Sequence, residues 1–366
     1  MSFLVSLGTA VPAHAHAQAT ILEFMQRLVP MPASAQERLA RMYQRSGIET
    51  RYSVIPDYGC TPELRQLYPK TPDLEPFPGL SARMACFERE ALPLAMRAVS
   101  ACLERCPEQK RRITHLIAVT CTGLSAPGLD LQLLRALNLP TSTQRTAVHF
   151  MGCYAALHAL KMADAICRSQ PEAVVLLVCA ELCTLHFQKE ATPDNLAANL
   201  LFADGAAAAL ICGQAVRPRL PALRLAGFAS EVALEGWEAM AWNLSESGFL
   251  MRLSAEVPEL LQARMAPLVQ RALVSLGWPP EAITHWAIHP GGRKILEVAE
   301  QFLGLPPLTA SRAILAEYGN MSSPTVLFVL ERIWREQVQG LAGERILAAA
   351  FGPGLTLETA LLSVEA

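Results

Sequence analysis

One cysteine of this chain lies at a turn that could make its thiol a nucleophile. An apolar, strand-like run at 147–151 leads to Gly152 and Cys153, and apolar residues at helical spacing follow over 156–163. At a helix start, unpaired backbone N–H groups and the helix dipole favour an anion, so we expect a lowered pKa for the Cys153 thiol. Gly152 lets the backbone turn sharply and approach a substrate. Each of the ten cysteines could equally be a buried, inert thiol. Cys153 is a candidate nucleophile only if a base and an oxyanion donor occur at comparable turns elsewhere in the chain.

A histidine and an asparagine occupy two further turns of this kind. The run 283–288 is typical of a short buried strand, ends at His289 and precedes a helical run over 293–303. Asn320 opens another apolar helix, over 325–333. Alone, the histidine could be a core residue and the asparagine a helix cap. Together with Cys153 they form a constellation suited to thiol chemistry.

Four segments of the chain carry a resemblance to a known family: GCYAALHALKMA (152–163), AIHPGGRKILE (287–297), YGNMSSPTVLFVLE (318–331) and FGPGLTLETALL (351–362). They resemble the type III polyketide synthases, the chalcone-synthase-like group of the thiolase superfamily, and specifically its bacterial members. The likeness runs over nearly the whole chain. It implies an α/β fold of five αβαβα layers built from two similar halves, a homodimer, and a catalytic triad of Cys153, His289 and Asn320.

The resemblance also implies an iterative acyltransferase reaction on CoA thioesters. Cys153 would take an acyl group from acyl-CoA, with His289 as the ion-pair partner of the thiolate. Malonyl-CoA would then lose CO2 while His289 and Asn320 hold its thioester oxygen, and the carbanion would attack the acyl-cysteine. Repeated extension and ring closure would release a pyrone, a resorcinol or a related aromatic polyketide. Neutral hydrogen-bond donors suffice for these steps, so we expect neither a metal nor another cofactor.

The resemblance assigns several residues to a substrate cavity. Phe202 matches the gatekeeper between the CoA tunnel and the cavity. The other cavity positions are Cys121, Thr122, Cys183, His186, Trp242 and Met251. Trp242 stands where plant members have glycine and should narrow or redirect the cavity. A small residue at the Cys183 position opens a tunnel for a long acyl chain in some bacterial relatives. Cys121, Cys183 and Trp242 resemble bacterial members more than plant ones, which favours a fatty acyl or a malonyl starter over a bulky phenylpropanoid one. Taken alone, Cys183 and His186 could equally be core residues.

Basic residues on a predicted helix at 35–46 are candidates for binding the phosphates of CoA. Arg38, Arg41 and Arg45 recur at three- and four-residue spacing, which usually produces a solvated face. Guanidinium groups also bind phosphates well. Arg45 matches a basic position of the family, whereas Glu49 replaces its next lysine. Gly291 and Gly292 complete the predicted CoA contacts.

Length and composition restrict the domain organisation and the partners that the chain could have. The 366 residues suit two packed α/β halves, which we place at 1–215 and 216–366, and the second half repeats the order of elements of the first. A formal charge of −2 without a basic run argues against nucleic acid as a partner. No apolar stretch approaches the roughly 18 residues that a membrane span needs.

The first residues imitate a secretory signal but lack its positively charged beginning. We therefore predict that 3–7 is a core strand, that the protein is cytoplasmic and that its cysteines stay reduced. The pairs Cys102/Cys106 and Cys179/Cys183 have spacings found in zinc sites, but no second pair completes a tetrahedral set.

Three other functions compete with the polyketide synthase. A ketosynthase III would condense once and use a carrier protein, and segments 319–331 and 351–359 argue against it. A degradative or HMG-CoA-synthase-like relative would not decarboxylate malonyl-CoA. A non-catalytic acyl-CoA-binding paralogue would not be expected to keep Cys153, His289 and Asn320 intact. The sequence leaves the starter acyl group, its possible delivery by a carrier protein, the number of extensions and the mode of cyclisation open.

Overall fold

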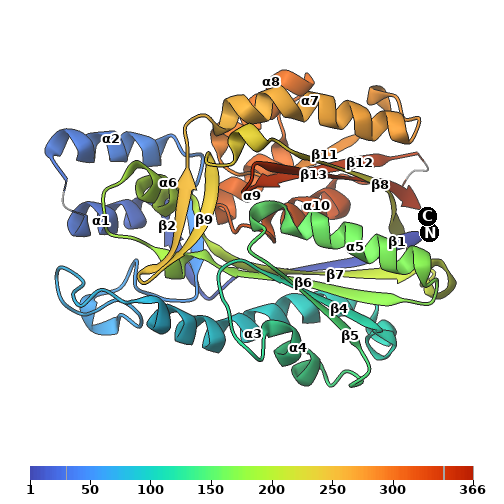
Figure 1. The fold of residues 1–366 in the computed structure, drawn as a ribbon, viewed down its shortest axis with the longest axis horizontal. Helices are drawn as coiled ribbons and strands as arrows, with labels where there is room; N and C mark the ends of the chain where they lie inside the picture. Colours follow the sequence, from blue (N-terminus) through green and yellow to red (C-terminus); the bar gives the residue numbers. More distant parts are fainter. Residues whose placement is uncertain (30, 341–342, 366) are drawn as a thin grey trace.

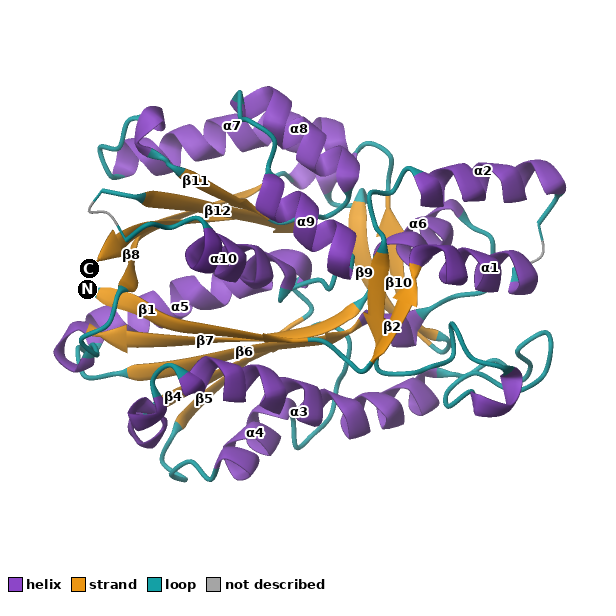
Figure 2. Ribbon diagram, turned by 180° about the vertical axis from the view of Figure 1, so that it is seen from behind, coloured by secondary structure: helices purple, strands orange, loops and turns teal. Residues whose placement is uncertain are grey.

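Helices and strands alternate in five stacked layers (Figure 1). The computed structural model describes residues 1–29, 31–340 and 343–365; residues 30, 341, 342 and 366, which fall within the two predicted halves, lie outside the described residues. Pairs of helices form the three helical layers: α7 (Val257–Ser275) with α8 (Arg293–Leu303) and α3 (Leu80–Glu104) with α4 (Leu129–Leu137) on the outside, and α5 (Ala155–Ser169) with α10 (Thr325–Glu336) in the middle. Figure 2 shows α5 and α10 from behind, again between the two layers of strands. The predicted αβαβα layering is confirmed.

Both strand layers belong to one nine-stranded sheet, of order β11-β12-β13-β8-β1-β7-β6-β4-β5. One layer contains β1 (Ser2–Ala10), β4 (His115–Thr120), β5 (Gln144–His149), β6 (Val174–Leu182) and β7 (Asp204–Gly213), and the other contains β8 (Ala222–Val232), β11 (His285–Ile288), β12 (Arg345–Gly352) and β13 (Thr356–Glu365). The layers join where Phe3 and Leu4 of β1 pair with Arg224 and Leu223 of β8. Beyond this short junction the two parts of the sheet diverge, and α5 and α10 fill the space between them (Figure 1).

The two halves repeat one strand order. Without its edge strand β5, the first half has the order β4-β6-β7-β1, and the second has β11-β12-β13-β8. The pairings also correspond, because the first pair of each set is parallel and the next two pairs are antiparallel. In this correspondence α3 matches α7, and α5 matches α10. The segments that precede α5 and α10 therefore occupy equivalent places at the centre of the molecule.

A further group of elements covers the end of the molecule opposite to the two termini (Figure 1). It consists of β2 (His14–Ala17), α1 (Gln18–Leu28), α2 (Ala33–Gln44), β3 (Thr50–Ser53), α6 (Pro193–Leu201), β9 (Met240–Ser245) and β10 (Gly248–Leu253). Helix α9 (Thr309–Tyr318) packs beside α10. Because α2 ends at Gln44, Arg45 lies just past the helix on which it was predicted. No helix within the described ranges is both long and apolar enough to cross a membrane.

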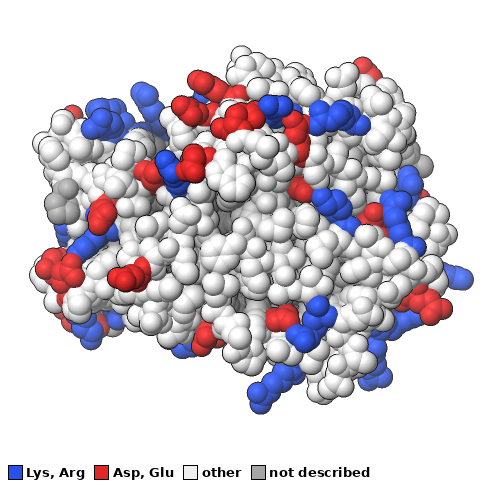
Figure 3. Space-filling view, viewed as in Figure 1, with Lys and Arg blue, Asp and Glu red and all other residues white. Residues whose placement is uncertain are grey.

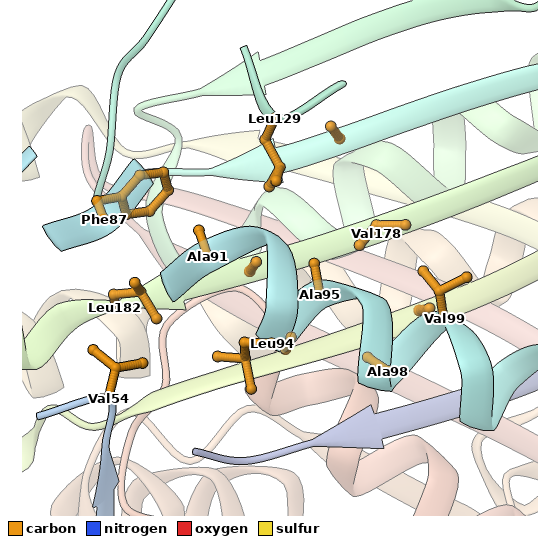
Figure 4. Packing of buried hydrophobic residues seen from close by; sticks show 14 of the residues in the cluster. Val54, Phe87, Ala91, Leu94, Ala95, Ala98, Val99, Leu129, Val178 and Leu182 are labelled. Atoms are coloured by element: carbon orange, nitrogen blue, oxygen red, sulfur yellow. The ribbon is translucent and has the colours of Figure 1, made fainter. Parts of the chain in front are cut away.

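Helix α3 shows how the outer layers bury their apolar faces. Its buried residues recur at three- and four-residue spacing and pack against strand β6, with further contacts at the edges of the cluster. The residues labelled in Figure 4 are Phe87, Ala91, Leu94, Ala95, Ala98 and Val99 on α3, Val178 and Leu182 on β6, and Val54 and Leu129 beside them. The alanines allow the helix axis to lie close to the sheet.

The closest approach of α3 to the sheet is at Gly8 of β1. A Cβ atom at Gly8 would lie 2.2 Å from the backbone nitrogen of Cys102 and 2.4 Å from the carbonyl oxygen of Ala98. The same part of α3 is fixed to β1 by the Ser6 hydroxyl, which donates to the Cys102 carbonyl over 2.6 Å. Since the crowded atoms belong to the helix backbone, no single side chain can move aside to make room.

We therefore expect Gly8→Ala to destabilise the fold strongly. Overpacking a buried contact costs about 1–3 kcal/mol, and a clash with two backbone atoms belongs at the upper end of that range. Urea denaturation of the variant should show the loss as a lower transition midpoint. Thr9→Ala, next to it on the opposite face of β1, is the control and should change the midpoint much less. Equal midpoints for Gly8→Ala and the unmodified protein would contradict the close packing.

Candidate active site

The backbone turns sharply before Cys153, as the sequence predicted, but the strand that leads into the turn differs from the predicted one. The strand before it, β5, is a mostly exposed edge strand that ends at His149, two residues before the end of the strand-like run predicted at 147–151. The turn is made by positive φ angles at Phe150 (56°) and Gly152 (76°), after which a short 3-10 turn leads into α5. A Cβ atom at Gly152 would also lie 2.5 Å from Cδ of Pro353. Glycine is thus needed there both for the backbone conformation and for contact with the second half.

Asn320 lies opposite Cys153, before the equivalent helix α10. The Cys153 Sγ is 3.9 Å from Asn320 Oδ1 and 3.7 Å from Ser322 Oγ. The backbone N–H of Ser322 donates to Asn320 Oδ1 over 2.8 Å, which fixes the orientation of the amide. Asn320 Nδ2 therefore faces the other way, toward the Gly291 carbonyl at the long distance of 3.5 Å. A hydrogen-bond donor beside the thiol is left available for a substrate oxygen.

His289 completes the group and is fully buried at the end of β11. Its backbone N–H donates to the Ala349 carbonyl over 2.8 Å, and its ring packs edge-on against Phe351. Neither ring nitrogen has a hydrogen-bond partner among the described residues. Burial lowers the pKa of His289 to about 3, so the ring is neutral. An unsatisfied buried polar group costs about 1–3 kcal/mol, so this ring is prepared for a ligand that supplies the missing partners.

The thiol of Cys153 does not have the lowered pKa that its place at a helix start suggested. Burial raises its pKa to about 11, and the buried Glu181 carboxylate acts in the same direction, whereas the hydrogen bonds with Ser322 and Asn320 act to lower it. Desolvation disfavours the charged form of both partners, because it raises the pKa of a thiol and lowers that of an imidazole. For the empty cavity these shifts favour neutral groups at both residues, and the thiolate–imidazolium ion pair with His289 stays a prediction.

A buried carboxylate below the thiol was missed by the sequence analysis. Glu181, at the end of β6, accepts hydrogen bonds from the Cys121 N–H (2.9 Å), the Thr122 hydroxyl (2.7 Å) and the Ser323 hydroxyl (2.7 Å). Burial raises the pKa of Glu181. Because Cys121 and Thr122 belong to the first half and Ser323 precedes α10, this side chain joins the two halves directly under the site. An acidic residue within an otherwise apolar central strand was the signal that could have identified it.

One cavity of about 510 Å³ contains these groups. It is lined by Cys153, His289 and Asn320 and by six of the seven predicted cavity residues: Cys121, Thr122, Cys183, Phe202, Trp242 and Met251. Trp242 is a fixed part of its wall, since the indole N–H donates to the Cys121 carbonyl over 2.7 Å. Within the described ranges, no group of three or more histidine, cysteine or acidic side chains could hold a metal ion, and all ten cysteines are free thiols.

His186 does not line this cavity. Its Nε2–H donates to the Thr122 carbonyl over 2.7 Å, and its Nδ1 accepts from the Phe249 N–H over 3.1 Å. The ring stacks on Phe249 with 4.3 Å between centroids. Burial lowers its pKa to about 3. Both ring nitrogens are occupied, and His186 lines a small adjoining cavity instead of this one, so its role as a substrate-cavity residue stays a prediction.

The predicted CoA contacts divide into two groups. Arg45, Gly291 and Gly292 line the cavity, whereas Arg38 and Arg41 are absent from its lining. Arg41 lies 3.8 Å from Glu37 on the exposed face of α2. Arg38 and Arg41 belong to α2, whereas Arg45 lies just past its end.

Two further basic residues, Arg293 and Lys294, line the cavity at the start of α8 and were missed. Arg293 donates to Glu297 over 2.8 Å, while the Lys294 ammonium is 3.9 Å from the same carboxylate. Their position directly after the Gly291-Gly292 pair could have identified them from the sequence as candidate CoA contacts.

Comparison with known proteins identifies the fold and its relatives. Family models described as chalcone and stilbene synthases match residues 1–215 (N-terminal domain) and 228–365 (C-terminal domain). The structure of PKS-I from the brown alga Ectocarpus siliculosus is 28% identical with a TM-score of 0.91, over 99% of this chain and 98% of that one. The type III pentaketide synthase from Neurospora crassa is 26% identical with a TM-score of 0.85, over all of both chains.

A bacterial enzyme is as similar in sequence as the algal one. The 1,3,6,8-tetrahydroxynaphthalene synthase from Streptomyces coelicolor A3(2) is 28% identical with a TM-score of 0.87, over 100% of this chain and 99% of that one. A bacterial subclass for this chain therefore stays a prediction. Two family models that together match most of the chain, and thiolase-like structures that match it throughout, agree on one assignment. The chain belongs to the chalcone and stilbene synthase family and is a type III polyketide synthase.

Proposed function

We propose that Cys153 carries the acyl group and the growing polyketide, and that His289 and Asn320 hold the thioester oxygen of malonyl-CoA. The observation that supports this most is the meeting of three groups in one mostly apolar cavity: a thiol, an imidazole whose nitrogens have no partner among the described residues, and an amide N–H with a weak partner. The two halves, which we place at 1–215 and 216–366, supply the thiol and its two partners respectively.

Neutral resting groups imply that the thiol is activated during the attack. As the Cys153 Sγ forms its bond to the thioester carbon of the starter, His289 takes the thiol proton. The CoA sulfur then leaves with the bonding electron pair and receives that proton from the imidazolium, which yields acyl-Cys153, free CoA and neutral His289. Charge separation is thus confined to the time when a substrate fills the cavity.

Extension then uses the same donors without further proton transfer. The thioester oxygen of malonyl-CoA accepts from the N–H of His289 and from Asn320 Nδ2, which stabilises the enolate as the C–C bond to CO2 breaks. The enolate carbon attacks the carbonyl of acyl-Cys153, and the cysteine sulfur leaves, ready to accept the lengthened chain. Phe202, on the cavity wall, helps keep water away from the enolate. Because protein donors provide the stabilisation, these steps need no cofactor.

The nucleotide end of each CoA thioester is held at the mouth of the cavity. Arg45, Arg293 and Lys294 line the cavity there and are the basic residues in its lining. Their charges suit the phosphates of CoA, and Gly291 and Gly292 let the pantetheine arm pass close to the backbone. Arg38 and Arg41, which are absent from the cavity lining, are left out of this assignment.

We further propose a homodimer. Strand β5 is at the edge of the sheet, so one side of its backbone has no strand beside it within the described ranges. Leu124 and Leu131, near this edge, are exposed apolar residues. The middle of the face shown in Figure 3 also carries few charged side chains. A second copy would cover these features, and its side chains would lie near the elbow that follows β5.

A cytoplasmic location fits the ten free thiols. A reducing compartment keeps such thiols unpaired.

The assignment of Cys153 is tested by incubating the purified protein with radiolabelled malonyl-CoA and a panel of acyl-CoA starters. Cys153→Ala should lower the formation of pyrones or resorcinols by at least about a thousandfold, because the covalent intermediate cannot form. Cys60→Ala, which removes a thiol outside the cavity, is the matched control and should keep the unmodified rate. Product formation by Cys153→Ala at the control rate would refute the assignment, and products of a single condensation would favour ketosynthase chemistry.

The neutral resting state predicts a steep pH dependence for alkylation of Cys153. Iodoacetamide reacts with the thiolate, and a thiol with a pKa of about 11 gains thiolate about tenfold per pH unit across the neutral range. The rate, followed by mass spectrometry of the Cys153 peptide, should therefore rise about a hundredfold from about pH 7 to about pH 9. A rate that stays flat over this range would instead indicate a thiolate–imidazolium pair at rest.

Lys294→Ala should weaken the binding of CoA thioesters without slowing the chemistry. We expect the KM for malonyl-CoA to rise about fivefold at unchanged kcat, because an exposed ionic contact contributes up to about 1 kcal/mol. The KM for malonyl-pantetheine, which lacks the phosphates, should not change. Arg38→Ala is the control and should leave both values as they are. A larger rise in the KM for malonyl-CoA with Arg38→Ala than with Lys294→Ala would contradict the assignment of the residues at the cavity mouth.

A further inference from the structure

A second, much smaller cavity lies behind the wall of the catalytic cavity. Its volume is about 30 Å³, enough for about two water molecules. Four residues line both cavities and so form the partition between them: Cys183, Phe202, Trp242 and Met251. Trp242 is held by its hydrogen bond to Cys121, whereas Met251 has an unbranched, adaptable side chain. Movement of the Met251 side chain would therefore open the partition without breaking a hydrogen bond of that side chain.

The small cavity has polar groups on part of its lining, beside apolar side chains such as Ile21, Met25 and Phe249. The hydroxyl, amide and guanidinium groups are contributed by Arg51, Ser53, Tyr58, Gln188, Asn195 and Asn199. An alkyl chain that entered this space would displace water from these groups without replacing its hydrogen bonds.

Arg51 is the cation of this cavity and is only 4% exposed. Its Nε donates to Gln18 over 2.8 Å, and its Nη1 donates to the carbonyls of Asn199 (2.7 Å) and Phe202 (2.8 Å). Its Nη2 has no hydrogen-bond partner within the described part of the chain. These contacts fix the guanidinium and leave one of its nitrogens unused.

No carboxylate described in the structure forms an ion pair with Arg51. Asp204, whose charge acts on Arg51, uses its oxygens to accept from the N–H groups of Val54 (2.9 Å) and Thr184 (2.8 Å) and from the Thr184 hydroxyl. A buried cation without an anion is costly, and a carboxylate bound to it makes a strong, charge-assisted hydrogen bond.

We propose that this cavity is a subsite for the terminal carboxylate of the acyl group on Cys153, and that the preferred starters are short ω-carboxyacyl thioesters, of which malonyl is the shortest. The carboxylate reaches Arg51 past Met251 and supplies the missing partner of Nη2. This rests on the proposed role of Cys153. It selects the short dicarboxylic starters over the fatty acyl starters that the sequence left open, because a space of about 30 Å³ beside the Arg51 guanidinium suits a carboxylate and is too small for a long alkyl chain.

The test compares starters of equal shape and different charge. Succinyl-CoA is matched with 4-methylpentanoyl-CoA and glutaryl-CoA with 5-methylhexanoyl-CoA, since an isopropyl end copies the shape of a carboxylate. With the unmodified protein, kcat/KM for acyl transfer to Cys153 should favour the carboxylate member of at least one pair by about tenfold or more, as expected for a charged hydrogen bond. Equal values within both pairs would overturn the proposal.

Two variants separate recognition from structural damage. Arg51→Gln should lower the carboxylate preference about tenfold, whereas damage to the Phe202 segment alone would slow both members of a pair equally and leave their ratio unchanged. Because Arg51→Gln can impair folding, Asn195→Leu is the second variant. It fills the small cavity without removing a partner of Arg51 and should reduce the same ratio. An unchanged ratio in Asn195→Leu would count against the subsite.

The same samples distinguish failure of this proposal from failure of the proposed function. Mass spectrometry of the Cys153 peptide reports acylation by each starter. Acyl-Cys153 formed equally from charged and neutral starters refutes the subsite alone. Absence of acyl-Cys153 with every starter, including malonyl-CoA, refutes the proposed role of Cys153 and the subsite with it.

Discussion

The hydrogen bonds to the buried carboxylate of Glu181 hold the catalytic centre together. Two donors come from the turn after β4 and one from the segment before α10, so a single side chain fixes both halves of the molecule under the thiol. A buried carboxylate is tolerated only when such donors surround it, because its desolvation is otherwise costly. The carboxylate also raises the pKa of Cys153, so the group that stabilises the architecture works against a resting thiolate.

Burial explains why the site is inert until a substrate arrives. The same apolar surroundings that raise the pKa of Cys153 lower that of His289, and both effects favour uncharged groups. A substrate changes this balance, since its thioester offers a carbon for the sulfur and an oxygen for the donors. Reactivity is therefore a property of the filled cavity, and an empty one protects its thiol from unspecific chemistry.

Much of this arrangement could be predicted from the sequence. The positions of Cys153, His289 and Asn320 at strand ends and helix starts followed from hydrophobic periodicity, and the αβαβα layering followed from the family resemblance. The errors have one physical cause, which is that local patterns do not specify side-chain direction or burial. Arg38, Arg41 and Arg45 were predicted on one helix, but α2 ends at Gln44, and of the three only Arg45 lines the cavity. His186 is held by backbone groups of Thr122 and Phe249, which are far away in sequence. The lowered thiol pKa was inferred from a helix start alone, without the desolvation that the completed fold imposes.

The contact between Gly152 and Pro353 bears on how the protein is made in the cell. Gly152 belongs to the turn that presents the thiol, whereas Pro353 lies late in the second half, in the turn between β12 and β13. A ribosome therefore releases the nucleophile long before it releases the residue that braces its turn. An unfinished chain holds a cysteine without its histidine, its asparagine or the wall behind it, so chemistry on CoA thioesters is withheld until translation has passed through both halves.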